Sequence, residues 1–116
     1  MAEIKIKNLK LRTILGVEDW ERKTRQDIVI NIRFTFDGSK AAESDDLNDT
    51  VDYKAMKQKI IKMVENSKFF LVEKLAGEVL KICMSDAMVE KATVEIDKPH
   101  ALRFADSVSV SISGEK

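Results

Sequence analysis

Few residues of this sequence interrupt or cross-link the chain. Its 116 residues include one cysteine, one proline, one histidine and four glycines. A single cysteine excludes a disulfide within the chain, and one cysteine with one histidine are too few for the usual zinc sites. No linker rich in proline, glycine or serine, no internal repeat and no low-complexity segment divides the sequence. We therefore expect one domain covering residues 1–116.

An excess of charge of either sign is also missing. Lysine and arginine number 20, as do aspartate and glutamate, so the formal net charge is zero. Proteins that bind nucleic acid in general carry a basic excess, which this chain lacks. No apolar run is long enough to span a bilayer or to form the core of a signal peptide. With one cysteine, which suits a reducing compartment, we expect a soluble cytoplasmic protein that binds neither nucleic acid nor membranes.

Alternation of apolar and polar residues predicts four strands. The alternation is cleanest over 27–36, and shorter versions cover 91–97 and 107–113. Residues 3–14 alternate with a phase shift around Asn8, which predicts a β-bulge. The predicted sheet is small, and few prolines or lysines block its edges. Joining of edges into a ring of subunits would satisfy them.

Between the second and third predicted strands, the apolar period becomes helical. It begins at Val51 and resumes over 71–82 after a polar break. The segment 37–50 is rich in aspartate, serine and asparagine and is expected to be a loop, with Asp49 or Thr50 capping the first helix. The order β-β-α-α-β-β predicts an α+β fold with two helices on one face of an antiparallel sheet.

Four polar residues fall beside the predicted element boundaries, where functional sites are common. Glu21 lies in the long first loop, Tyr53 opens the first helix, Glu73 lies in the first turn of the second helix, and Lys98 ends the third strand. Each also has a structural explanation. Glu73 favours the positive end of a helix, and Lys98 could be a solvated strand end. The apolar residues around Glu73 predict a partly buried carboxylate, which needs a donor.

Other groupings are weaker. Cys83 falls on the apolar stripe of the second helix, which predicts core packing. Ser107, His100 and Asp106 could be written as a nucleophilic triad, but their spacing does not favour one. No phosphate-binding loop, GxGxxG or GxSxG motif is present. Composition and spacing alone therefore indicate a soluble α+β oligomer with a candidate acid–base site.

Four stretches together resemble the dihydroneopterin aldolase family. They are "LGVEDWERKTRQDIVINI", "SDDLNDTVDY", "FFLVEKLA" and "VEIDKPHAL", and the resemblance extends from Ile4 to Ile112. It implies the tunnelling fold, in which the sheets of subunits join into a tetrameric barrel and two barrels stack into a homo-octamer. It also implies active sites between subunits, with no metal and no cofactor.

The resemblance assigns the pterin-binding role to Glu73. Its carboxylate would accept from the 2-amino group and a ring N–H of the pterin, a charge-assisted pair that gives both orientation and affinity. Backbone groups near Val51 and Val72 would complete the pocket.

The resemblance also assigns three catalytic roles. Lys98 would transfer protons at the hydroxyls of the substrate side chain, directly or through a water. Tyr53, from a neighbouring subunit, would handle a proton of the enol intermediate. Glu21 would lie near the reacting side chain and hold a water or a hydroxyl. The dihydropterin ring itself would accept the electrons.

Two reactions share such a site. Aldolases cleave the C1′–C2′ bond of 7,8-dihydroneopterin, giving 6-hydroxymethyl-7,8-dihydropterin and glycolaldehyde on the way to folate. Epimerases invert C2′ of 7,8-dihydroneopterin triphosphate, giving the dihydromonapterin isomer that leads to tetrahydromonapterin. The stretches "LKLRTILGV" and "HALRFADSVS" resemble the epimerase branch, whereas "GVEDWE" and the pair Lys98-Pro99 resemble aldolases. We expect the epimerase, with the aldolase as the alternative.

A triphosphate needs cationic or N–H donors, and three residues could supply them. These are Arg12, His100 and Arg103. Arg103 could instead pair with Asp106 or Glu95. Two rival hypotheses are a non-catalytic ring-forming module with a pterin pocket and a zinc enzyme of the same fold. The four polar residues argue against the first, and the missing histidines argue against the second.

Overall fold

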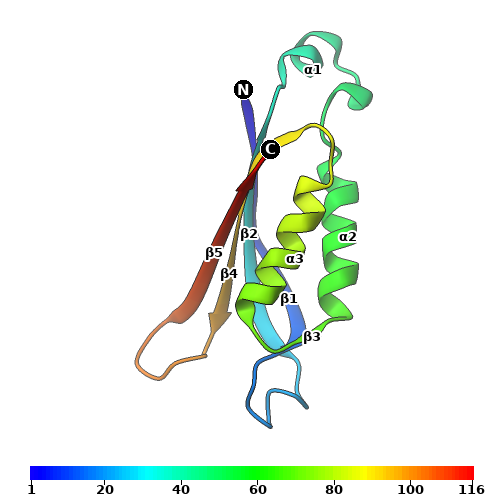
Figure 1. Ribbon diagram of the computed structural model, residues 1–116. Helices are drawn as coiled ribbons and strands as arrows, with labels where there is room; N and C mark the ends of the chain where they lie inside the picture. The colour runs from blue at the N-terminus through cyan, green and yellow to red at the C-terminus, as the bar shows by residue number, and fades with distance from the viewer.

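The computed structural model describes residues 1–116 as a curved sheet covered on one face by two long helices (Figure 1). Along the chain the elements are β1 (Ala2–Leu15), β2 (Gln26–Phe36), α1 (Ser39–Ser44), the 3-10 helix η1 (Leu47–Asp49), α2 (Tyr53–Glu65), β3 (Lys68–Phe69), α3 (Val72–Met84), β4 (Val89–Pro99) and β5 (Ser107–Glu115). The sheet order is β3-β1-β2-β4-β5. The predicted α+β plan is therefore confirmed, with three short elements added to it.

The four long strands pair antiparallel, and β1 carries the predicted bulge. Its register with β2 shifts between Ile6 and Leu9, and Asn8 adopts a positive φ of 53°. The backbone N–H of Asn8 donates to Oδ1 of Asn31 on β2 at 2.9 Å. A bulge increases the local twist, which helps the sheet to curve around the helices.

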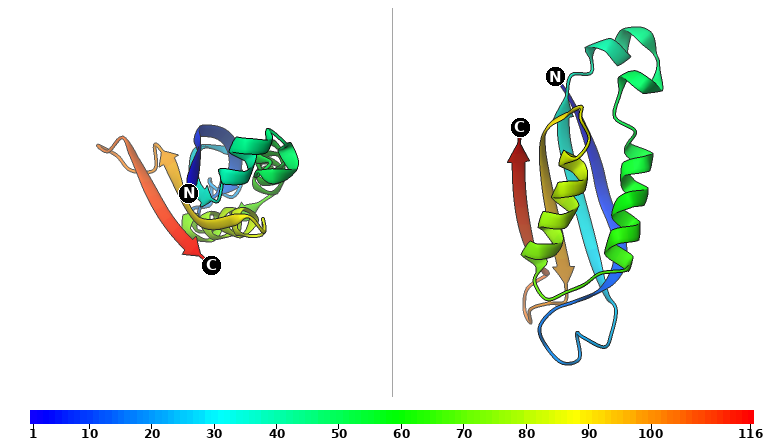
Figure 2. Two further views of the ribbon diagram at one scale, coloured as in Figure 1. Left: turned by 90° about the horizontal axis from the view of Figure 1, so that it is seen from above. Right: turned by 45° about the vertical axis from the view of Figure 1, so that its right-hand side comes forward.

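The core lies between the sheet and the two long helices, which cover the same face (Figure 2). Its fully or nearly fully buried residues include Ile28, Ile30, Ile32, Phe34 and Phe36 of β2, Met56, Ile60 and Val64 of α2, and Leu75, Ala76, Val79 and Cys83 of α3. Alternation in β2 and the helical stripes thus point these side chains at one another, as predicted. Cys83 is 0% exposed within this core, which confirms its packing role, and burial raises the pKa of its thiol to about 12.

The segment between β2 and α2 differs from its prediction. Residues 37–50 contain α1 and η1 rather than only a loop. The carboxylate of Asp52 caps α2 by accepting from the backbone N–H of Ala55 at 3.0 Å, so the prediction of Asp49 or Thr50 as the cap was wrong. Asp52 stands directly before the first helical turn, and from there its oxygen reaches a free N–H.

A fifth, very short strand was also missed. Lys68 and Phe69 form β3, which pairs parallel with Ile14 and Leu15 at the end of β1. Two residues are too few to show an alternating pattern, so the sequence carried no signal for this strand. It brings the segment before α3 beside the end of β1.

The chain is elongated, with a long dimension of 52 Å. The loop between β1 and β2, the end of β4 and the start of α3 lie at one end (Figure 1). The start of α2, with α1 beside it, lies at the other end. None of the helices is both long and apolar enough to cross a membrane.

Candidate active site

A lysine and a glutamate form a buried ion pair where β4 ends. The Nζ atom of Lys98 donates to Oε2 of Glu21, and the two residues are 9% and 6% exposed. Lys98 falls on a buried position of the alternating pattern of β4, so its side chain lies on the core face of the sheet rather than in solvent. The alternative of a solvated strand end was therefore wrong. Each buried charge needs the other, because an unpaired charge at this depth is strongly unfavourable.

The carboxylate of Glu21 is surrounded by donors. Besides Lys98, it accepts from Nε2 of Gln26 at 3.0 Å and from the backbone N–H of Glu18 at 3.2 Å. Burial raises the pKa of Glu21, but the hydrogen bonds from Lys98, Gln26 and Glu18 outweigh it and leave the pKa below its ordinary value. Glu21 is thus an ionised acceptor at neutral pH.

The backbone at the end of β1 is shaped around this carboxylate. A Cβ atom added to Gly16 would lie 2.2 Å from the carboxyl carbon of Glu21, and Gly16 has a φ of +135°. Only glycine adopts this conformation without strain and leaves the space free. Gln26 also donates to the carbonyl of Leu15 at 2.6 Å, so one amide holds both Glu21 and the end of β1.

Sequence reasoning did not assign Gly16, Gln26 or Arg22 to the site. Gly16 and Gln26 lie within the stretch "LGVEDWERKTRQDIVINI" that resembles the family, but neither was given a role. Arg22 donates to three backbone carbonyls at 2.7–3.0 Å. A glycine beside a strand end is a usable signal, whereas an arginine that binds carbonyls leaves no trace in the side-chain pattern.

Glu73 lies in the first turn of α3 but is exposed, so the prediction of a partly buried carboxylate was wrong for the isolated chain. Leu75 and Ala76 turn toward the core, and Glu73 lies on another side of the helix. The N–H of Val72 donates to no acceptor within the chain. Because α3 starts at the end of the molecule where β4 finishes, Glu73 and Lys98 belong to the same end (Figure 1).

Val51 and Tyr53 lie at the opposite end, where α2 begins. The Val51 side chain is 1% exposed, whereas Tyr53 is 51% exposed. Both border a hollow of about 390 Å³ beside Leu47 and Asp52. One chain therefore brings together Glu21, Lys98 and the start of α3, but not Tyr53.

Two of the three residues predicted to bind phosphates come together. Arg12 and His100 line one hollow of about 420 Å³ with Asp27. Nε of Arg12 pairs with Asp27 at 3.2 Å, and His100 is exposed with a φ of 67°. Arg103 is not part of this hollow, and its guanidinium lies 5.8 Å from the ring centroid of Phe104.

The other groupings considered from the sequence do not form in the structure. Arg103 forms no ion pair, so it pairs with neither Asp106 nor Glu95. The hydroxyl of Ser107 donates to Asp97 at 2.9 Å instead of joining a triad with His100. No group of three or more His, Cys, Asp or Glu side chains is arranged to hold a metal ion.

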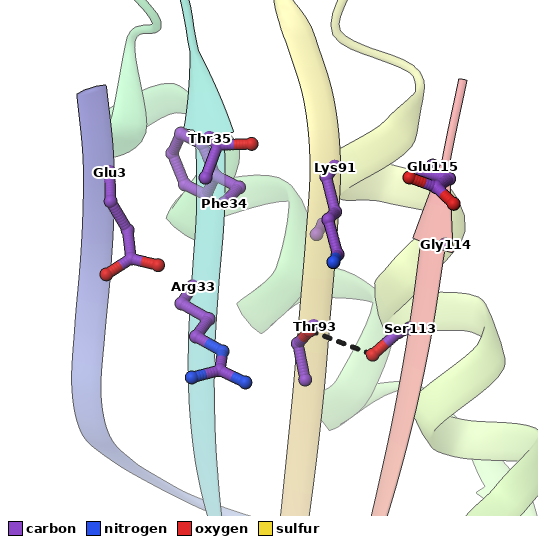
Figure 3. Close-up of a pocket in the computed structure, with 10 residues that line it drawn as sticks. Glu3, Arg33, Phe34, Thr35, Lys91, Thr93, Ser113, Gly114 and Glu115 are labelled. Carbon is purple, nitrogen blue, oxygen red and sulfur yellow. Dashed lines mark hydrogen bonds between the residues drawn. The ribbon is translucent and has the colours of Figure 1, made fainter. Parts of the chain in front are cut away.

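The open face of the sheet, away from the helices, holds a separate hollow of about 440 Å³ (Figure 3). Arg33 and Lys91 project into it beside Thr93 and Ser113, whose hydroxyls are hydrogen-bonded at 2.9 Å. None of the predicted site residues lines this hollow. The candidate active site is therefore the end of the molecule marked by Lys98.

Comparisons with known proteins identify the family of this chain. A family model described as FolB, dihydroneopterin aldolase, matches residues 4–113. The dihydroneopterin triphosphate 2'-epimerase of Escherichia coli strain K12 is 48% identical over 115 residues, covering 99% of this chain and 96% of that protein. The dihydroneopterin aldolase of the same strain is 34% identical over 107 residues, covering 92% and 88%.

A solved structure confirms the fold. The crystal structure of E. coli dihydroneopterin aldolase in complex with neopterin superimposes with a TM-score of 0.93 at 32% identity, covering 98% of this chain and 99% of that chain. The predicted tunnelling-fold subunit and the predicted family are both confirmed. This chain belongs to the dihydroneopterin aldolase family.

Proposed function

We propose that this chain epimerises C2′ of 7,8-dihydroneopterin triphosphate, giving dihydromonapterin triphosphate. The observation that carries the proposal is the buried pair of Lys98 and Glu21, an acid and a base held together at a strand end. Greater similarity to the relative named as an epimerase than to the one named as an aldolase supports the choice of reaction. Aldolase cleavage of 7,8-dihydroneopterin is the alternative, favoured by the pair Lys98-Pro99.

Pterin recognition falls to the start of α3 in this proposal. The exposed carboxylate of Glu73 accepts from the 2-amino group and a ring N–H, a bidentate charge-assisted contact. The free N–H of Val72 adds a donor beside it. Backbone groups of Val51 complete the pocket from another subunit.

The proposed chemistry is a reversible carbon–carbon cleavage. Removal of the proton from the C2′ hydroxyl lets the C1′–C2′ bond break, and C2′ becomes the carbonyl carbon of an aldehyde. The electron pair of the broken bond forms a double bond between C1′ and the dihydropterin ring, which makes an enol, and the adjacent ring nitrogen gains a proton. Lys98 takes up this proton as a neutral amine, directly or through a water that Glu21 holds, and Tyr53 handles the enol proton. Addition to the other face of the aldehyde re-forms the bond with C2′ inverted and returns the proton.

The proposal requires a homo-oligomer, and we propose an octamer of two tetrameric barrels. Two observations support an oligomer. Tyr53 begins a helix at the opposite end of the molecule from Lys98. β5 leaves one edge of the sheet open for pairing with another subunit. A second subunit then supplies Tyr53 and Val51. We propose residues 1–116 as one domain acting in the cytoplasm, which suits a chain with one buried cysteine.

Phosphate binding is proposed for the hollow that Arg12 and His100 line, with Arg103 in the adjoining loop. Arginine suits this role because its planar donors match phosphate oxygens. The pairing of Arg12 with Asp27 is surface-exposed, so a triphosphate competes with it at little cost.

Chromatography of the products from 7,8-dihydroneopterin and from its triphosphate tests the proposal. Conversion of the triphosphate to its C2′ epimer as the dominant outcome supports it. Dominant release of glycolaldehyde from 7,8-dihydroneopterin supports the aldolase instead. A protein that binds both pterins and converts neither would be a non-catalytic module, and both proposals would fail.

A further inference from the structure

We propose that Arg22 is a positioning residue that fixes the loop carrying Glu21 to the segment leading into α3. This inference rests on the proposed function, because it gives Arg22 the task of holding Glu21 and Glu73 in mutual alignment. Nothing in the proposed reaction requires Arg22 to touch a substrate.

The guanidinium of Arg22 joins three segments. Its NH1 atom donates to the carbonyls of Gly16 and Phe69, each at 3.0 Å, and its NH2 atom donates to the carbonyl of Lys68 at 2.7 Å. Its central carbon lies 3.9 Å from the ring centroid of Phe70. Three charge-assisted hydrogen bonds and a cation–π contact on one half-buried side chain form a strong local attachment.

Glu21 and Arg22 are neighbours in the loop, but they bind different parts of the fold. Glu21 binds Lys98 on β4 and Gln26 on β2, whereas Arg22 binds β3. The loop is therefore fixed on both sides, with its carboxylate facing one way and its guanidinium the other.

Gly16 connects the two attachments. Its Cα faces the Glu21 carboxylate, its carbonyl accepts from Arg22, and its N–H donates to the carbonyl of Phe69 at 3.2 Å. Phe69 in turn lies only four residues before Glu73. A displacement of the guanidinium is thus passed to both carboxylates of the proposed site.

The geometry calls for arginine rather than any cation. A lysine at position 22 offers one nitrogen, which cannot reach three carbonyls in a fork or stack on Phe70 as a planar group. Arg25, three residues along the same loop, makes one guanidinium bond, to the carbonyl of Glu65 at 3.0 Å. Arg25→Ala is therefore a matched control.

The attachment is tested first without any ligand. Trp20 is the only tryptophan of the chain, lies in the same loop and is 58% exposed. Time-resolved fluorescence anisotropy reports its local motion on the nanosecond timescale. Arg22→Ala is expected to increase the amplitude of this motion, and Arg25→Ala is expected to leave it unchanged. Equal amplitudes in Arg22→Ala and the wild type would overturn the attachment.

The second test is kinetic. Arg22→Ala is expected to lower kcat with the triphosphate by about 10–100-fold, because a displacement near 1 Å is that costly for aligned groups. The kcat of Arg22→Lys is expected to lie between that of Arg22→Ala and that of the wild type. If Arg22→Ala does not fold, Arg22→Lys takes its place in the test. The acid limb of the pH–rate profile should also move to higher pH, because a displaced Glu21 loses its bonds to Lys98, Gln26 and the Glu18 N–H.

The results separate the two proposals. Wild-type kcat, KM and pH profile in both Arg22 variants would overturn the positioning role. A wild-type protein that acts on neither pterin contradicts the proposed function, and the Trp20 measurement then still decides whether Arg22 holds the loop. Loss of kcat with an unmoved acid limb and an unmoved Trp20 signal also counts against the positioning role.

Discussion

The ammonium of Lys98, at the end of β4, is buried against the carboxylate of Glu21, 77 positions earlier in the chain. This contact closes the loop between β1 and β2 over the end of the sheet. It gives the protein a paired acid and base that are shielded from bulk water on most sides. Both the stability and the proposed chemistry of this end therefore depend on the same two residues.

The pair makes a prediction about stability. Lys98→Met leaves a buried carboxylate without its counterion, and Glu21→Gln leaves a buried ammonium without its own. Each is expected to lower the free energy of unfolding by about 3–5 kcal/mol, whereas the double variant recovers part of that loss. Denaturant unfolding of the four proteins measures this, and additive losses would show that the pair is not coupled.

A second prediction concerns acid stability. The pKa of Glu21 lies below its ordinary value in the folded protein, so Glu21 contributes stability above its unfolded pKa of about 4.3 and loses it as the pH falls through the lowered folded pKa. Between pH 6 and pH 3, the melting temperature of the wild type should therefore fall more steeply than that of Glu21→Gln. Parallel curves would contradict the direction of the shift.

Gly16 gives a third prediction. Gly16→Ala introduces a Cβ that collides with the Glu21 carboxylate at a backbone angle unsuited to alanine, so kcat is expected to fall about 10²-fold. Gly77→Ala is the control, because a Cβ there meets nothing within 4 Å in the middle of α3. That control should keep full activity and raise stability by about 0.5–1 kcal/mol. Equal activity in the two variants would show that Gly16 does not shape the site.

A fourth prediction follows from the separation of Tyr53 and Lys98 at opposite ends of one chain. If sites form between subunits, Tyr53→Phe and Lys98→Met are each nearly inactive, but co-refolded mixtures contain sites with both native residues. About a quarter of the sites in a random 1:1 mixture are expected to be native, and activity should recover to that degree. Mixtures as inactive as their components would contradict a site that takes Tyr53 and Lys98 from different subunits.

The sequence predicted the parts of this molecule that depend on local patterns. Alternation in β2 and the helical stripes located the core, and the phase shift at Asn8 located the bulge. Lys98 was correctly assigned to the end of a strand, because strand ends are visible in the alternation.

Features that depend on contacts across the fold could not be predicted. The pairing of Glu21 with Lys98 needs the sheet to be assembled, and Arg22 binds backbone carbonyls, which every residue offers. The strand β3 has only two residues, too few to show an alternating pattern in the sequence. The exposure of Glu73 was missed because apolar neighbours in the sequence do not decide which side of a helix a residue occupies.

Turnover of 7,8-dihydroneopterin triphosphate by Lys98→Met tests the central claim most directly. The matched control is Lys91→Met, an exposed lysine on the same strand. With both variants folded by circular dichroism, Lys98→Met is expected to lower kcat by about 10²–10⁴-fold, and Lys91→Met is expected to match the wild type. A folded Lys98→Met variant with wild-type kcat would contradict the assignment of Lys98 as the proton-transfer residue.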